Sequence, residues 1–148
     1  MKLEPQWITG FTDGEGCFHV GIATHSEMTL GYQILPEFTV VQHKRDEQVL
    51  YALKAYFGCG VVRNNHGDRM AFRVRKLEHL RTIIIPFFSK HMLKTKKQTD
   101  FKKFCRVLSM MEKGGHLTVE GLEKIRAIAS QMNVKGMHDL QDVVDDKE

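Results

Sequence analysis

Cysteine is scarce and unpaired in this chain. Only three cysteines occur among the 148 residues, Cys17, Cys59 and Cys105, and no two of them form a C-x-x-C pair. This spacing argues against a zinc knuckle and a disulfide framework, and it favours reduced thiols in an intracellular compartment. The eight histidines form no H-E-x-x-H motif, so we expect no histidine-based metal cluster.

Long apolar runs are also missing. The longest, residues 82–88, is far too short to span a bilayer, so we expect no membrane partner. Because the most informative motif begins at residue 7, we expect no signal or transit peptide. The length predicts one domain with its own core. The compartment stays open between an organelle-encoded protein and a bacterial cytoplasmic one.

Charge is unevenly distributed along the chain. Residues 81–106 carry eight Lys or Arg against the single acid Asp100, and residues 63–76 carry five against Asp68. From Met137 onward the sign reverses, with five acids against Lys147. Basic blocks followed by an acidic end suggest a polyanion footprint and a solvated tail. A charged helix face unrelated to nucleic acid explains the basic blocks equally well.

Residues 7–18 place two carboxylates and three glycines between an apolar helical pattern and a strand pattern. Pro5 favours a helix start, and the carboxylates Asp13 and Glu15 fall at the expected helix end. Acids there oppose the helix dipole, so local stability does not explain them, whereas a bound divalent cation does. The alternative is a glycine cap with two solvated acids.

The nine residues 8–16 resemble the signature of the LAGLIDADG homing endonucleases. Gly10, Asp13 and Gly16 match it outright, while Thr9 and Thr12 depart from it by small polar substitutions that a helix interface could tolerate. The resemblance continues downstream and covers most of the chain up to about residue 133.

Hydrophobic periodicity predicts one helix and two strands, then the same order again. Apolar residues alternate along residues 18–23 and 32–40, which predicts half-buried antiparallel strands. Asp46 is a candidate cap for a helix that Gly58 ends. A second strand pair should turn at residues 66–68, and a helix over residues 77–87 should break near Pro86.

Two further helical patterns follow, the last of them capped by Thr118. This order is the α+β arrangement that the resemblance implies: an αββαββα core with a four-stranded curved antiparallel sheet forming a DNA-binding saddle, plus C-terminal helices. We expect a domain over residues 1–133 and an acidic C-terminal tail over residues 134–148.

Alternation indicates which side chains leave the sheet on the side away from the core. Since Phe72 and Val74 are expected in the core, their neighbours on the last strand should face outward. An ordinary polar face is the alternative. With the resemblance, a two-stranded ribbon in the DNA major groove is the better account. The expected DNA-binding residues are His19, His25, Gln33, Glu37, Thr39, Arg63, Asn65, Arg69, Arg73 and Arg75.

The resemblance also implies a catalytic set. Glu15 is the expected ligand of a divalent metal, for which Mg²⁺ is suited as a hard ion, and Gln42 and Lys96 are placed at the edge of the site, with Lys96 ranked before Lys97 and Lys94. Strict alternation would point Gln42 at the core, so its placement assumes that the strand ends or bulges there. Asp13 is expected to brace the turn by accepting backbone hydrogen bonds.

Only one signature is present in the chain. Because cutting a duplex requires two active sites, the resemblance implies a homodimer joined through Trp7, Gly10, Phe11 and Gly14. The expected protein is a magnesium-dependent, site-specific, intron-encoded double-strand DNA endonuclease with a long, nearly palindromic target and no small-molecule substrate. The alternatives are an intron RNA maturase of the same fold and a non-cleaving DNA-binding regulator.

Overall fold

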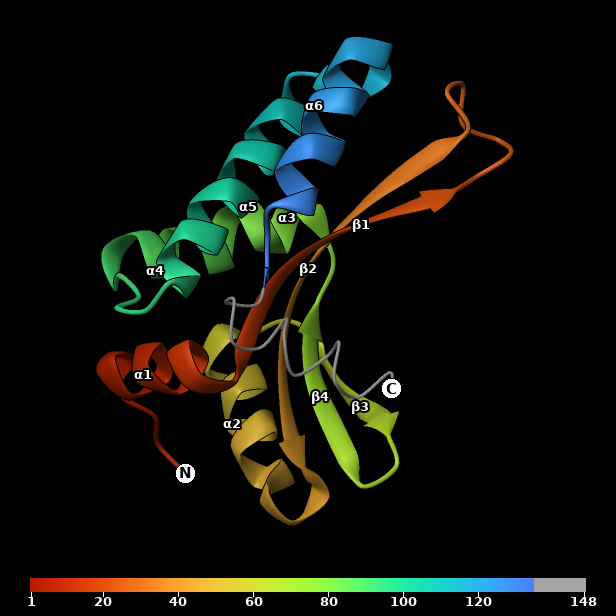
Figure 1. The fold of residues 1–148 in the computed structure, drawn as a ribbon. Helices are drawn as coiled ribbons and strands as arrows, with labels where there is room; N and C mark the ends of the chain where they lie inside the picture. The colour runs from red at the N-terminus through yellow and green to blue at the C-terminus, as the bar shows by residue number, and fades with distance from the viewer. Residues whose placement is uncertain (135–148) are drawn as a thin grey trace, which may run out of the picture.

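The computed structural model describes residues 1–134, which form a four-stranded sheet and a set of helices (Figure 1). The chain runs from α1 through two strands, a helix and two more strands before its C-terminal helices. The elements are α1 (Pro5–Glu15), β1 (Gly16–Thr24), β2 (Tyr32–His43), η1 (Lys44–Asp46), α2 (Glu47–Phe57), β3 (Val61–His66), β4 (Arg69–Val74), α3 (Leu77–His79), η2 (Leu80–Ile84), α4 (Ile85–Lys90), α5 (Lys97–Glu112), η3 (Gly115–Leu117) and α6 (Val119–Ser130). The predicted α+β order is confirmed.

The strands form one antiparallel sheet in the order β1-β2-β4-β3. β1 and β2 make a long hairpin that extends beyond the other two strands, toward α6 (Figure 1). The Arg126 guanidinium of α6 lies over the Tyr32 ring, next to the turn of this hairpin, 4.9 Å from the ring centroid. The helices of residues 1–134 lie along one side of the sheet, and none of them covers the other side.

The helix side of the sheet holds the core. Register places Phe18 opposite Phe38 and Val40 opposite Phe72, and all four side chains are fully buried. The Phe18 ring lies 5.4 Å from that of Phe88, whose helix covers the sheet. The alternation predicted from the sequence is therefore confirmed, and the residues between these positions face the open side.

Two predicted helix boundaries are confirmed. Gly58 ends α2 in the left-handed conformation, with φ +69°, and its N–H donates to the Lys54 carbonyl. Thr118 caps α6, because its hydroxyl oxygen accepts the Gly121 N–H at 3.0 Å. Gly60, with φ +88°, is required for packing as well, since a Cβ there would lie 2.6 Å from the Phe72 ring.

Two other predictions about the helices were wrong. Asp46 occupies the N-cap position of α2 but its side chain makes no capping hydrogen bond. Instead, the His43 side chain accepts the Arg45 N–H and starts a short 3-10 turn ahead of the helix. Pro86 does not break its helix, because the preceding π-helical turn, η2, widens the backbone just before the proline.

The described part of the chain contains no helix with the length and apolarity needed to cross a membrane. Of the predicted acidic tail, residues 135–148 lie outside the described residues.

Candidate active site and nucleic-acid interface

The site begins where α1 passes directly into β1. The Gly16 N–H donates to the Thr12 carbonyl as the helix ends. A Cβ at Gly16 would lie 2.6 Å from the Thr12 methyl group, so only glycine allows this tight passage. Glu15, the last residue of the helix, is left exposed at the junction. Within residues 1–134 its carboxylate makes no hydrogen bond or ion pair.

Asp13, two residues earlier, has the opposite environment. Its Oδ2 accepts the Lys94 N–H at 2.8 Å, and its Oδ1 accepts both the N–H and the hydroxyl of Thr95, at 3.1 and 2.6 Å. Partial burial raises the pKa of Asp13, but these hydrogen bonds outweigh it and hold the pKa below its ordinary value. Asp13 thus ties α1 to the turn before α5, as the sequence predicted.

The basic run before α5 places one lysine against the end of α1. The Lys97 Nζ donates to the carbonyls of Thr12 and Asp13, at 2.9 and 3.0 Å. Burial lowers the pKa of this amine, while nearby negative groups, including Glu15, act in the opposite direction. The Lys96 Nζ instead donates to the Val134 carbonyl at 2.7 Å. Lys97, which the sequence ranked second, is therefore the lysine that reaches the α1–β1 junction.

Gln42 lies on the helix side of the sheet. Register pairs it with Met70 without a bulge, and β2 continues to His43, so the assumption that the strand ends or bulges at Gln42 was wrong. β1 begins opposite Val40. Gln42 is therefore beyond the start of β1, on the same side of the sheet as α1, and its catalytic role stays a prediction.

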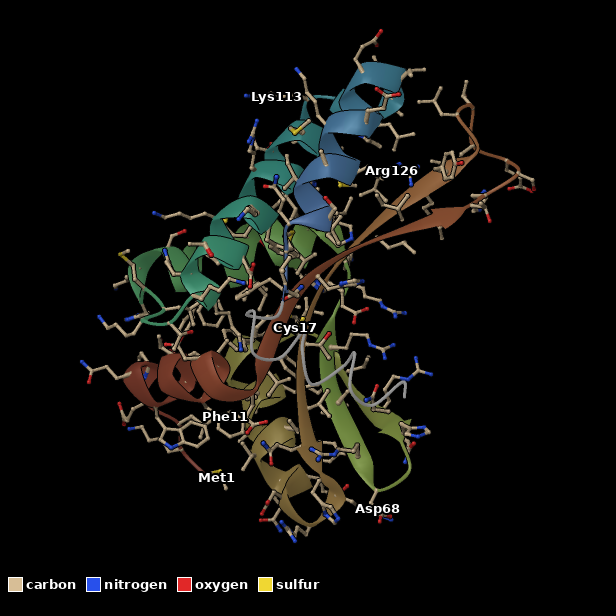
Figure 2. All side chains as sticks on the ribbon, in the orientation of Figure 1. Met1, Phe11, Cys17, Asp68, Lys113 and Arg126 are labelled. Carbon is tan, nitrogen blue, oxygen red and sulfur yellow. The ribbon has the colours of Figure 1, made fainter. Side chains whose placement is uncertain are left out.

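The open side of the sheet carries most of the predicted DNA-binding residues. Register aligns His19 with Glu37, and Thr39 with Arg73, while Arg63 lies opposite the fully buried Ala71. Figure 2 shows nitrogen-tipped side chains along β3 and β4, with Asp68 at the turn between them. Four other predicted residues lie outside the central part of the strands. His25 lies in the β1–β2 turn, and Asn65 lies at the register shift of β3. Gln33 and Arg69 lie near the ends of their strands.

Glu37 forms an ion network on this side. It accepts hydrogen bonds from the Thr39 hydroxyl at 2.7 Å and from the Arg75 Nε at 2.6 Å, and it lies 3.7 Å from the Arg73 Nε. Partial burial raises the pKa of Glu37, but these donors and the two arginine charges outweigh it and lower the pKa below its ordinary value. The carboxylate is therefore charged at neutral pH.

One face of α1 is unburied within the chain. Trp7 is 44% exposed and stacks on Phe11 with ring centroids 4.7 Å apart. Figure 2 shows Phe11 on the side of α1 turned away from α5. At Gly10 and Gly14 an added Cβ would meet nothing within 4 Å among the described residues. Of the four predicted interface residues, Trp7, Gly10 and Gly14 are thus exposed, whereas Phe11 is half-buried and packs against the core.

Sequence reasoning missed the residue that fastens the end of α6 to the sheet. Asn133 has a positive φ of 56°, donates its side-chain amide to the Phe18 carbonyl at 2.9 Å, and donates its backbone N–H to Asp100. This contact spans 115 positions of the sequence. No local pattern marks it, apart from the tolerance of asparagine for the left-handed region.

Comparison with known proteins agrees with this geometry. Residues 8–108 match the family model described as LAGLIDADG endonuclease. A Neurospora crassa protein named "Probable intron-encoded endonuclease 2" is 33% identical over 133 residues, which cover 88% of this chain and 29% of that protein. The chain thus spans less than a third of this relative, and 23% of a second one from the same organism.

Solved structures extend the comparison to the whole fold. The crystal structure of the homing endonuclease I-TnaI is 55% identical, with a TM-score of 0.88, and all of both chains is covered. The structure of I-SmaMI bound to an uncleaved DNA target in the presence of calcium ions is 31% identical, with a TM-score of 0.86, and the match covers 89% of this chain and 45% of that one.

Proposed function

We propose, on the premise that this chain belongs to the LAGLIDADG endonuclease family, that it is an intron-encoded, site-specific double-strand DNA endonuclease. The observation that carries the proposal is the α1–β1 junction, where an exposed carboxylate, Glu15, lies near the amine of Lys97. The open basic side of the sheet begins at the same junction, so bound DNA would pass close to both groups.

The residues present suit a hard divalent cation held jointly with DNA. Residues 1–134 contain no group of three acidic, histidine or cysteine side chains able to hold a metal alone. Mg²⁺ commonly takes one or two carboxylates together with substrate phosphates and water, so a single free carboxylate fits it. Glu15 is that ligand, because both Asp13 oxygens are engaged by residues 94 and 95.

Each residue then has a distinct task. When bound, Mg²⁺ supplies charge neutralisation and lowers the pKa of a water at the scissile phosphate. Glu15 keeps its carboxylate free for this ion, and Lys97 offsets negative charge at the phosphate with an amine anchored to two helix carbonyls. Gln42 is proposed to orient water at the edge of the site. Arginines of the open sheet hold the target in register.

A homodimer completes the account. Each chain supplies one Glu15, whereas a duplex has two strands to cut. Pairing two α1 helices through Trp7, Gly10, Phe11 and Gly14 would bring two copies of Glu15 close to one two-fold axis and would match a nearly palindromic target. The open face of α1 supports this arrangement, since no atom of the described residues lies within 4 Å of a Cβ at either glycine.

The proposal is tested by incubating the protein with a plasmid library that carries intronless gene sequences, with and without magnesium. We expect one plasmid class to be linearised only when magnesium is present. Binding of a target without cleavage would favour the non-cleaving regulator, and preferential binding of intron RNA without any DNA cleavage would favour the maturase.

A further inference from the structure

Glu37 is unexpected on a surface proposed to face DNA. It is the one carboxylate carried by the four strands β1 to β4. An acid on such a face repels the phosphates and weakens association with DNA of any sequence. Direct readout of a cytosine amino group would explain an acid here, but the contacts of Glu37 argue for another role.

Both oxygens of the Glu37 carboxylate are engaged within the chain. Oε1 accepts the Thr39 hydroxyl at 2.7 Å and faces the Arg73 Nε at 3.7 Å, while Oε2 accepts the Arg75 Nε at 2.6 Å. The Glu37 side chain is 18% exposed, and that of Arg73 is 15% exposed. A base would have to displace these partners to reach the carboxylate.

The two arginines meet Glu37 differently: the Arg75 Nε donates a hydrogen bond to it, whereas the Arg73 Nε lies 3.7 Å away in an ion pair. Within residues 1–134, neither Arg73 nor Arg75 donates a hydrogen bond from its terminal Nη atoms. Within residues 1–134 the Arg73 Nε is buried without a hydrogen-bond partner, so Glu37 restrains this guanidinium by charge attraction alone. Each guanidinium thus keeps its terminal N–H groups available, and these groups can donate to the O6 and N7 acceptors of guanine.

We propose that Glu37 is a positioning residue that holds Arg75 by an Nε hydrogen bond and Arg73 by an ion pair, and that leaves the terminal nitrogens of both arginines for guanine bases. Thr39 also donates its hydroxyl to the Glu37 carboxylate, so the four side chains of Glu37, Thr39, Arg73 and Arg75 act as one unit. Ordering the guanidinium groups before DNA arrives lowers the entropy cost of binding. This inference rests on the proposed function, since it assigns the target class of the open sheet: duplexes with guanines opposite β4.

The proposal predicts effects of opposite sign on affinity and specificity. Glu37→Gln removes one negative charge, which should tighten binding to random duplex by about two- to threefold. It also loosens two arginines, which should lower the ratio of target affinity to random-duplex affinity by about tenfold. This loss is smaller than the full discrimination that two bidentate guanine contacts provide. Glu123→Gln is the matched control, because it makes the same charge change at an exposed position of α6.

The experiment measures binding of the full-length protein without divalent metal, by fluorescence anisotropy, to its target duplex and to a random duplex of equal length. Base preference is profiled at every target position for Glu37→Gln, Glu123→Gln and the double variant Arg73→Ala/Arg75→Ala. Glu37→Gln should relax preference at the same positions as the double variant. It should change nothing further when added to the double variant.

Two outcomes would overturn the proposal. If Glu37→Gln still alters base preference in the Arg73→Ala/Arg75→Ala background, Glu37 contacts a base itself. If it tightens target and random duplex equally, as Glu123→Gln should, it contributes charge alone. Failure of the proposed function is distinguishable, because the unmodified protein would then leave its target duplex uncut in magnesium or would discriminate no duplex.

A measurement on the free protein needs no target. The Nε–H signal of Arg75, which donates to Glu37, should exchange slowly with water in the NMR spectrum of the unmodified protein and rapidly in Glu37→Gln. Equal exchange in both proteins would contradict the positioning role, whatever the outcome with DNA.

Discussion

The two faces of α1 have different environments and different roles. On the inner face, Ile8, Thr9 and Thr12 are buried against the rest of the chain, so the small polar departures from the signature lie in the core rather than at an interface between helices. On the outer face, Trp7, Gly10 and Gly14 are exposed. A single signature therefore combines residues that are buried in the core of this chain with residues that remain exposed on its surface.

The same division separates the two acids of the signature. Asp13 is held by three hydrogen bonds from residues 94 and 95, whereas Glu15 has no hydrogen-bond partner within residues 1–134. It separates two glycines as well, since a Cβ is excluded at Gly16 but has open space at Gly14. Substitutions of Asp13 and Gly16 should thus lower stability. Substitutions of Glu15 and Gly14 should impair function and leave the fold intact.

The largest effect is expected at Glu15. Glu15→Gln keeps the size of the side chain but removes the charge that a magnesium ion requires. Cleavage of the target in magnesium should fall by at least about a thousandfold, because each ~1.4 kcal/mol of lost charge stabilisation slows a reaction tenfold. Folding and target binding should survive, as thermal unfolding and anisotropy can check. Substantial double-strand cutting by this variant would assign the site to another residue.

Gly14→Leu should separate assembly from folding. A Cβ at this position meets no atom of residues 1–134 within 4 Å, so the monomer should keep its fold and its circular dichroism spectrum. Between two paired helices the same side chain would hold the backbones apart, so sedimentation should show monomer and duplex cutting should be lost. Gly16→Ala is the contrasting variant, because its clash with Thr12 should destabilise the fold itself.

A smaller effect is expected at the lysines before α5. Lys97→Met should slow cleavage by about a hundredfold, the usual consequence of removing one group that stabilises developing negative charge. Lys96→Met should slow it far less, because the Lys96 amine contacts Val134 rather than the end of α1. Single-turnover rates on the same target give the comparison, and a larger loss in Lys96→Met would restore the ranking made from the sequence.

The smallest effect should be a loss of stability at Asp13. Asp13→Asn should lower the free energy of unfolding because it weakens the hydrogen bonds that the charged carboxylate accepts. The loss should be only about 1 kcal/mol, since solvent partly screens these hydrogen bonds. Although partial burial raises its pKa, the hydrogen bonds hold it below 3.8 in the folded protein, so the contribution is present above pH 3.8 and lost as the pH falls through the lowered value. The stability difference should therefore shrink in acid, which urea unfolding across the pH range can measure. A constant difference would contradict the role of the charge.

Local rules predicted the parts of the fold that depend on neighbouring residues. Strand alternation identified Phe18 and Phe38 as inward, and the left-handed preference of glycine placed the end of α2 at Gly58. The capping hydroxyl of Thr118 is likewise a local feature. These elements were predictable because the sequence positions that determine them lie within a few residues of each other.

The remaining features depend on contacts between distant segments. Choosing between Lys96 and Lys97 requires the rotation of α5 against α1, and one helical position changes the side-chain direction by about 100°. Pro86 was expected to break a helix, but the π-helical turn ahead of it depends on how that helix packs. The network of Glu37 joins β2 to the end of β4 across 38 positions of the sequence. Sequence spacing therefore showed that Glu37 is an acid among basic residues, but it could not show which residues it contacts.

The central claim is that each chain contributes one Glu15 and cuts one strand, and a mixed dimer tests it most directly. Unmodified protein and Glu15→Gln carrying different affinity tags are refolded together, and the dimer bearing both tags is isolated and given supercoiled plasmid with the target in magnesium. The account predicts nicked circles that are not converted to linear DNA. Linear product at the rate of the unmodified dimer would contradict it.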